Sequence, residues 1–130
     1  MIRGLKVVLI VYGAAEILLG LASILAPYTV GQMFGLGEIE SYVPYLMAMF
    51  GGALIAVSVG FIFAGLDPLR NIPLVKLAIL WSLLGVVTQL YSVIQGAVDF
   101  SQAGTGIIMD AVFAALFLAF YPYRQLKAES

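Results

Sequence analysis

The sequence predicts an all-α integral membrane protein, a four-helix bundle with both termini on one side of the bilayer. Of its 130 residues, 63% are hydrophobic and 10% are charged, whereas soluble domains are about half apolar and about a quarter charged. The mean hydropathy is +1.10. The apolar residues form continuous runs, as in membrane helices, whereas the strands of a membrane barrel alternate apolar and polar residues. This length corresponds to one domain, residues 1–130.

Each apolar run reaches the roughly 17–25 residues that a helix needs to cross about 30 Å of hydrocarbon. The runs cover residues 7–26, 43–66, 74–98 and 103–123.

The first run follows a basic start and is ended by Pro27. A cleaved signal peptide is an alternative for residues 1–27, because a basic start also precedes the apolar part of a signal peptide. The run is long for a signal peptide, contains Glu16 and ends in Leu-Ala-Pro without a small-x-small cleavage site. We therefore expect a retained membrane helix.

The connection that follows, residues 27–42, is long for a four-helix bundle. It is either a short helix lying in the membrane interface or an irregular loop. Its apolar residues recur at near-helical spacing: Val30, Met33, Phe34 and Leu36.

The second run carries a small residue at every fourth position. Such a stripe lets a neighbouring backbone approach closely, which is how helices associate inside a membrane. We expect it to pack within the monomer, with a homodimer interface as the alternative. The stripe consists of Ala48, Gly52, Ala56, Gly60 and Ala64.

The later breaks differ in chemistry. Residues 67–73 form a polar turn in which Pro73 is well placed to begin the third helix. Residues 99–106 are small and polar and are expected to form a loop. After Pro122 the chain becomes polar, and we expect it to fray.

The third run carries polar and small residues at three- and four-residue spacing, so that they share one helix face. An amide without a hydrogen bond in hydrocarbon is costly, so this face should turn toward the other helices and form a polar spine of the bundle. Its members are Ser82, Gly85, Thr88, Gln89, Ser92, Gln95, Gly96 and Asp99.

The basic residues predict the orientation. All of them precede the first run, flank the second turn or follow the fourth run, and none lies in the first or third connection. The positive-inside rule then places both termini in the cytoplasm and the chain in the inner (plasma) membrane. The basic residues are Arg3, Lys6, Arg70, Lys76, Arg124 and Lys127.

Glu16 is the main candidate for a functional residue. It lies ten residues beyond Lys6 and thus roughly 15 Å deeper, near the bilayer midplane. A charge there costs about 2.5 kcal/mol or more. Glu16 must therefore be protonated, hydrated, hydrogen-bonded or paired with another molecule. We expect hydrogen bonds from Thr88 and Gln89. Tyr12 and Gly20, one turn either side on the same helix face, should leave room around the carboxyl.

Two further acids lie toward the outer side. Asp110 is expected one or two turns below the outer surface, and Asp99 caps the outer end of the third helix, with Gln95 one turn beneath it. With Glu16 they would form a graded acidic path suited to a proton, a cation, an amine or a polar lipid headgroup. Alternatively, Asp99 and Asp110 lie in the wet headgroup zone and Glu16 is a neutral hydrogen-bond anchor. We expect no metal site, because the three depths differ too much for one coordination shell.

Most enzymatic chemistry is excluded by composition. The chain has no histidine and no cysteine, which removes disulfides, zinc sites, iron–sulfur clusters and nucleophile–imidazole pairs. No nucleotide-binding or hydrolase motif is present, so we expect no enzyme and no cofactor. The net charge of -1, without a basic run, predicts no nucleic-acid binding.

The layout resembles that of the DoxX-like four-helix inner-membrane proteins of bacteria. The resemblance rests on a basic start and on a first helix with Tyr12-Gly13-Ala14-Ala15-Glu16, Gly20 and Pro27. It rests also on a second helix that contains Phe50-Gly51-Gly52-Ala53 and ends at Asp67-Pro68, before a short basic turn. It implies the fold, and association with redox or other membrane-complex partners as seen for some members. The chain lacks the intramembrane arginine of some such proteins. Small multidrug exporters also combine four short helices with a glutamate in the first, but their weak charge bias differs from the one-sided distribution here.

The sequence thus predicts a non-enzymatic multi-pass membrane protein. It would be an accessory or assembly subunit, or a binder of a lipid-like ligand between its helices. The alternative is a small proton-coupled transporter or carrier that uses Glu16. The expected partners are the lipid bilayer and either a larger membrane complex or further copies of the chain.

Overall fold

The computed structural model of the chain describes residues 2–33 and 43–129. Over these residues all regular secondary structure is helical, so the prediction of an all-α protein is confirmed. The helices are α1 (Ile2–Leu25), α2 (Pro27–Met33), α3 (Val43–Leu66), α4 (Ile72–Ile94), α5 (Phe100–Ala119) and α6 (Tyr123–Glu129).

Among the described residues, α1, α3 and α4 are long and apolar enough to cross a membrane. By helix length and composition the chain is therefore a membrane protein. The apolar part of α5, Ala103–Ala119, is shorter, so the fourth crossing stays a prediction.

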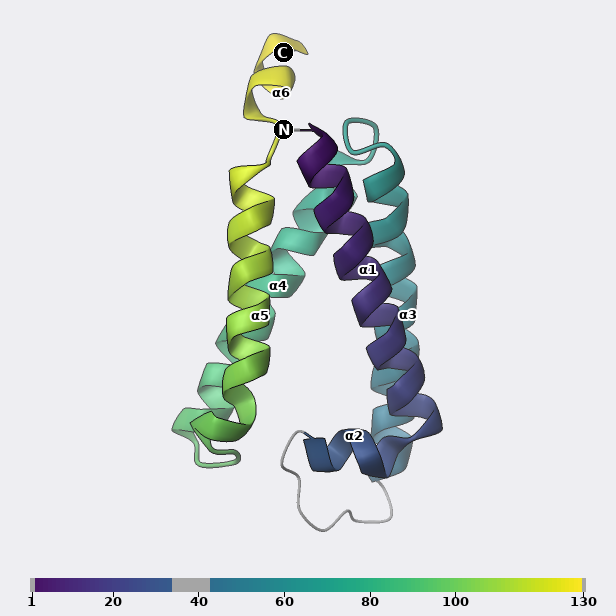
Figure 1. The fold of residues 1–130 in the computed structure, drawn as a ribbon, viewed down its shortest axis with the longest axis vertical. Helices are drawn as coiled ribbons and strands as arrows, with labels where there is room; N and C mark the ends of the chain where they lie inside the picture. The colour runs from purple at the N-terminus through teal and green to yellow at the C-terminus, as the bar shows by residue number, and fades with distance from the viewer. Residues whose placement is uncertain (1, 34–42, 130) are drawn as a thin grey trace.

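Proline residues begin helices where the sequence predicts it. Pro73 lies in the first turn of α4, where its missing N–H costs no hydrogen bond. Asn71 precedes that turn, and its Nδ2 donates to the carbonyl oxygen of Asp67 at 2.9 Å. Pro27 is the first residue of α2, which lies across the long axes of α1 and α3 (Figure 1). The placement of α2 in the membrane interface stays a prediction, and Phe34 and Leu36 lie outside the described residues.

Two expectations about irregular segments are wrong. The predicted loop 99–106 is mostly helical, because α4 ends at Ile94 and the chain turns at Gly96, whose φ is 76°, before α5 begins at Phe100. The polar segment after Pro122 does not fray at once but forms α6. In α6 the Leu126 N–H donates to the carbonyl oxygen of Pro122 at 3.1 Å, so this proline starts a helix as well as ending one.

The long helices form two antiparallel pairs, α1 with α3 and α4 with α5. Figure 1 shows that the pairs lie close together near the chain termini and diverge toward α2. A shared core joins them on the narrow side of this arrangement. It consists of Leu5, Leu9, Tyr12, Phe61, Ala64, Val75, Ala78 and Phe117.

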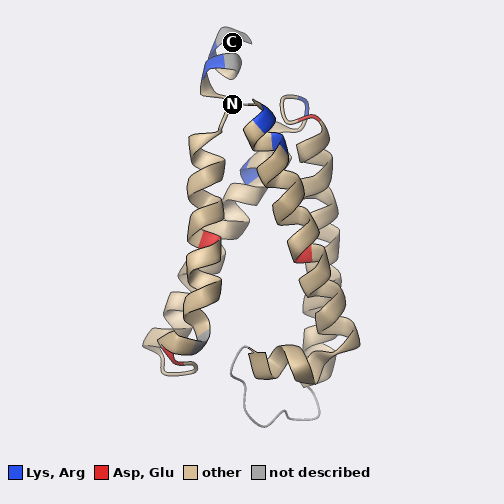
Figure 2. Cartoon of the chain, viewed as in Figure 1, with Lys and Arg blue, Asp and Glu red and all other residues tan. Residues whose placement is uncertain are grey.

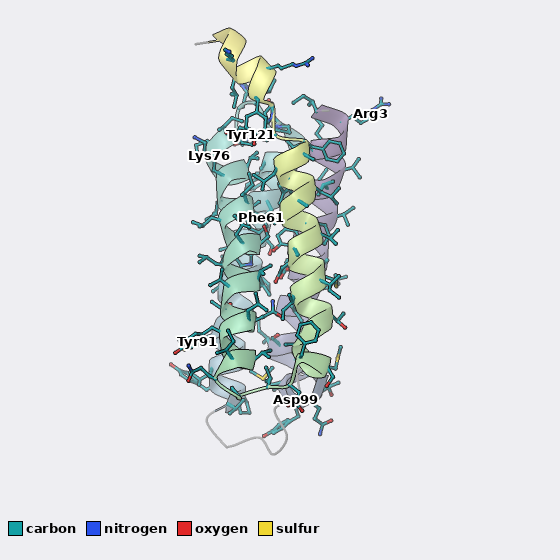
Figure 3. The ribbon with its side chains drawn as sticks, turned by 90° about the vertical axis from the view of Figure 1, so that its left-hand side faces the viewer. Arg3, Phe61, Lys76, Tyr91, Asp99 and Tyr121 are labelled. Carbon is teal, nitrogen blue, oxygen red and sulfur yellow. The ribbon has the colours of Figure 1, made fainter. Side chains whose placement is uncertain are left out.

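The basic residues gather at the end where the helix pairs lie close together, the closed end, as Figure 2 shows. The end at α2, where the pairs diverge, is the open end. Arg3 and Lys76 lie there, and Asp99 lies at the opposite end (Figure 3). The predicted separation of cationic residues from the outer connections therefore holds in the fold, and their assignment to the cytoplasm stays a prediction.

The close backbone contacts between α1 and α3 recur every seven residues, and each of them involves a glycine. A Cβ on Gly51 would lie 2.5 Å from the carbonyl oxygen of Gly20, and a Cβ on Gly13 would lie 3.0 Å from that of Ser58. A Cβ on Gly65 would lie 3.2 Å from that of Lys6. Seven-residue spacing keeps small residues facing a partner helix over several turns.

The small-residue stripe expected to pack within the monomer therefore does not do so along its whole length. Gly52 has no neighbouring atom within 4 Å of an added Cβ, and Gly60 has only a Leu74 methyl at 3.4 Å. Ala48 is half-buried, Ala56 is exposed and only Ala64 is buried. The physical reason is that four residues exceed one turn of about 3.6 residues, so a four-residue stripe winds around the helix.

Candidate functional site

A cavity of about 1320 Å³ lies between the two helix pairs. Its walls are mainly apolar, and every helix from α1 to α5 contributes to them. The lining residues are Ala15, Glu16 and Leu19 of α1, Met33 of α2, Phe50 of α3, Trp81, Leu84, Gly85, Thr88, Gln89 and Ser92 of α4, and Ser101, Thr105, Gly106, Met109 and Asp110 of α5.

Glu16 and Asp110 are the two ionisable side chains among the described residues that line the cavity. Figure 2 shows one acidic residue partway along α1 and one partway along α5, on opposite sides of the space between the pairs. Both line the same mainly apolar cavity, Glu16 from α1 and Asp110 from α5. The site thus combines an apolar wall with two facing carboxylates.

Asp110 lies further along its helix than the sequence predicts. Because α5 begins at Phe100, Asp110 is ten residues into the helix, roughly 15 Å from its start. The predicted depth of Asp110 below the outer surface stays a prediction, whereas the loop expected at residues 99–106 is replaced by the first turns of α5. Asp110 and Glu16 therefore face one cavity.

Both oxygens of Asp110 accept hydrogen bonds. Gln89 Nε2 donates to Oδ2 at 2.8 Å and also to the carbonyl oxygen of Gly85 at 2.9 Å. The Tyr12 hydroxyl donates to Oδ1 at 3.3 Å. Asp110 is thus held in place by side chains from two other helices, as polar groups within a membrane protein require.

Two glycines make room for this arrangement. The Asp110 carboxylate occupies the space where a Cβ on Gly85 would lie, and the Gln89 amide oxygen occupies the corresponding space beside Gly106. Each of α4 and α5 therefore packs a polar side chain onto a glycine of the other. The sequence predicts Gly85 on the polar face of the third helix. It does not predict that Gly106 makes room for Gln89, because residues 99–106 were expected to form a loop.

The expected partners of Glu16 are different in the structure. Gln89 binds Asp110 instead, and the Thr88 hydroxyl donates to the carbonyl oxygen of Leu84 in its own helix at 2.8 Å. Among the described residues, Glu16 has no hydrogen bond, although it is half-buried and faces the cavity. One carboxylate is therefore fixed and the other has vacant acceptor positions.

Tyr12 does not open space beside Glu16 as predicted. Its side chain is only 1% exposed, and its ring centroid lies 5.5 Å from Phe61, 4.6 Å from Phe113 and 5.3 Å from Phe117. Aromatic packing of this kind holds the ring rigidly. Tyr12 therefore joins the core to the site, with its ring in the core and its hydroxyl on Asp110.

The remaining candidates lie away from the carboxylates. Gln95 is the exposed C-cap of α4, and Asp99 is exposed at the open end, as Figure 3 shows. Neither is among the described residues that line the cavity. The outer part of the predicted acidic path, Asp99 with Gln95, is therefore not part of the cavity wall. The polar side chains that line the cavity there carry hydroxyl groups: Ser92 of α4, and Ser101 and Thr105 of α5.

No group of three or more acidic side chains that could hold a metal ion occurs within residues 2–33 and 43–129. Comparisons with protein-family models, with curated proteins and with solved structures found no match to this chain. The functional argument therefore depends on the geometry of the cavity.

Proposed function

We propose that this protein is a non-enzymatic multi-pass membrane protein that binds a lipid-like ligand in the cavity between its two helix pairs. The observation that supports this most directly is the cavity itself, with a volume of about 1320 Å³ and mainly apolar walls. Pockets for drug-sized ligands measure about 300–1,000 Å³. This cavity is large enough for an acyl chain and has its polar groups concentrated around Glu16 and Asp110.

The proposal includes α5 as a fourth membrane crossing, with the closed end of the bundle at the cytoplasmic face of the inner membrane. The distribution of basic residues supports this orientation. The cavity would then lie toward the outer half of the bilayer, where a lipid could enter between the diverging helix pairs.

The resemblance to DoxX-like proteins remains part of the proposal. Under that resemblance the chain would serve as an accessory or assembly subunit, and a bound lipid would mediate contact with a larger membrane complex or a second copy. A stoichiometric protein partner after mild extraction would support the accessory role.

Lipid binding can be tested by mass spectrometry of protein extracted in mild detergent. We expect a lipid-like molecule to remain bound to the unaltered protein. Ala15→Phe should remove it, because Ala15 lines the cavity and a phenyl group would fill part of it. Ala14→Phe is the matched control, because Ala14 is also exposed on α1 but is not among the residues lining the cavity. Equal retention by both variants would contradict the proposed location.

A proton-coupled carrier is the second candidate, favoured by the cavity-facing Glu16 that lacks a hydrogen bond to the described residues. Glu16→Gln keeps the shape of the side chain and abolishes its titration. For a carrier, this variant should fail to restore the phenotype of a strain that lacks the protein. A folded variant that restores it fully would exclude proton coupling through Glu16.

A further inference from the structure

We infer that the ligand carries a protonated amine, bound between Glu16 and Asp110, with its alkyl chain along the apolar wall of the cavity. This inference rests on the proposed function, because it specifies the head group of the lipid-like ligand.

Charge complementarity is the first argument. The ionisable residues among the described cavity lining are both acidic, and the basic residues lie at the closed end of the bundle (Figure 2). Glu16 and Asp110 line the same mainly apolar cavity, and like charges repel more strongly in surroundings of low polarity than in water. A cation between them converts the repulsion into two attractions, which a neutral or anionic head group does not provide.

Hydrogen-bonding capacity is the second argument. Asp110 already accepts from Tyr12 and Gln89, which fixes its position. Glu16 accepts no hydrogen bond from the described residues, so its oxygens are available to a donor. A primary ammonium group has three N–H donors and no acceptor, which suits a site whose charged groups only accept.

The shape of the cavity is the third argument. Apolar side chains line it from both helix pairs, among them Leu19, Phe50, Leu84 and Met109. From Glu16 to the end of α1 at Leu25 the helix rises roughly 14 Å at about 1.5 Å per residue. A ligand whose amine reaches Glu16 therefore needs a long alkyl chain to fill the space toward the open end.

Trp81 provides a direct measurement, because it is the single tryptophan of the chain and lines the cavity. Bromine atoms quench tryptophan fluorescence on contact, so dibromo-octadecylamine and dibromo-octadecanol are a pair of probes with the same chain and different head groups. In neutral detergent at neutral pH, we expect half-maximal quenching by the amine at a concentration about tenfold lower than by the alcohol.

Glu16→Gln should reduce this preference to about twofold or less, since the amide keeps the shape but loses the charge. Asp99→Asn is the matched control, because it removes one negative charge outside the cavity lining, and it should keep the tenfold preference. Far-ultraviolet circular dichroism verifies that both variants are folded. The comparison of the two probes on the unaltered protein tests the head-group charge without relying on any variant.

The possible failures are distinguishable. Equal quenching by amine and alcohol would overturn the cationic head group and leave lipid binding supported. Quenching by neither probe would overturn the proposed function itself. A preference for the amine that survives Glu16→Gln would overturn the assignment of the binding site to Glu16.

Discussion

Replacing Gly51 by alanine should weaken the α1–α3 pair, whereas replacing the neighbouring Gly52 should not. A methyl group on Gly51 would lie 2.5 Å from the carbonyl oxygen of Gly20 and 2.9 Å from Cγ1 of Ile24. The Ile24 side chain can rotate away, but the Gly20 oxygen is part of the α1 backbone. Accommodating the methyl group therefore requires α1 to move away from α3.

The expected magnitude follows from two opposing effects. Overpacking a close interface costs about 1–3 kcal/mol, and the better helix propensity of alanine returns up to about 1 kcal/mol. With the full helix-propensity gain, the free energy of unfolding for Gly51→Ala should fall by up to about 2 kcal/mol, and the difference from Gly52→Ala, which has the same gain, should be about 1–3 kcal/mol. Gly52 has open space around an added methyl group, so Gly52→Ala should be neutral or stabilising by up to about 1 kcal/mol.

Equilibrium unfolding by sodium dodecyl sulfate in mixed micelles, followed by far-ultraviolet circular dichroism, would measure both variants under the same conditions. The adjacent position of the two glycines makes them equivalent in depth along α3, so that the difference reports the α1 contact. If the two variants agreed within about 0.5 kcal/mol, the close backbone contact between Gly20 and Gly51 would be refuted.

Three further predictions concern the site and the orientation. Gln89→Leu removes the hydrogen bond of 2.8 Å that Gln89 donates to Asp110. It should lower the free energy of unfolding by roughly 1 kcal/mol in the same titration. An unchanged value would show that this hydrogen bond contributes nothing to stability. Tyr12→Phe removes only a long hydrogen bond of 3.3 Å and keeps the aromatic packing, so its cost should stay below about 1 kcal/mol, and a larger loss would contradict this division of roles. Because the chain has no cysteine, Asp99→Cys and Lys127→Cys can be labelled individually in intact cells with a membrane-impermeant maleimide. Asp99→Cys should react at once and Lys127→Cys only after permeabilisation, and the reverse pattern would overturn the orientation.

The sequence alone determined the features that depend on local composition. The apolar runs predicted all-helical structure, and the start of α4 at the polar turn followed from Pro73. The clustering of basic residues at one end was also predictable from the sequence. Each helix crosses the length of the bundle, so every second connection lies on the same side as the termini, and the basic residues occur only in those segments. These features need no knowledge of which helices touch.

Only the tertiary structure decided which side chains meet. The glycine contacts between α1 and α3 have a seven-residue spacing, which depends on how the two helices cross, and the more regular four-residue stripe winds away from the interface. The small residues of segment 99–106 suggested a loop, yet α5 begins at Phe100, and Gly106 within it accommodates the Gln89 side chain of α4. In the resulting helix α5, Asp110 lines the same cavity as Glu16 and accepts a hydrogen bond from Gln89. Sequence spacing specifies a face of a helix, whereas the partner of that face is set by packing between helices distant in the chain.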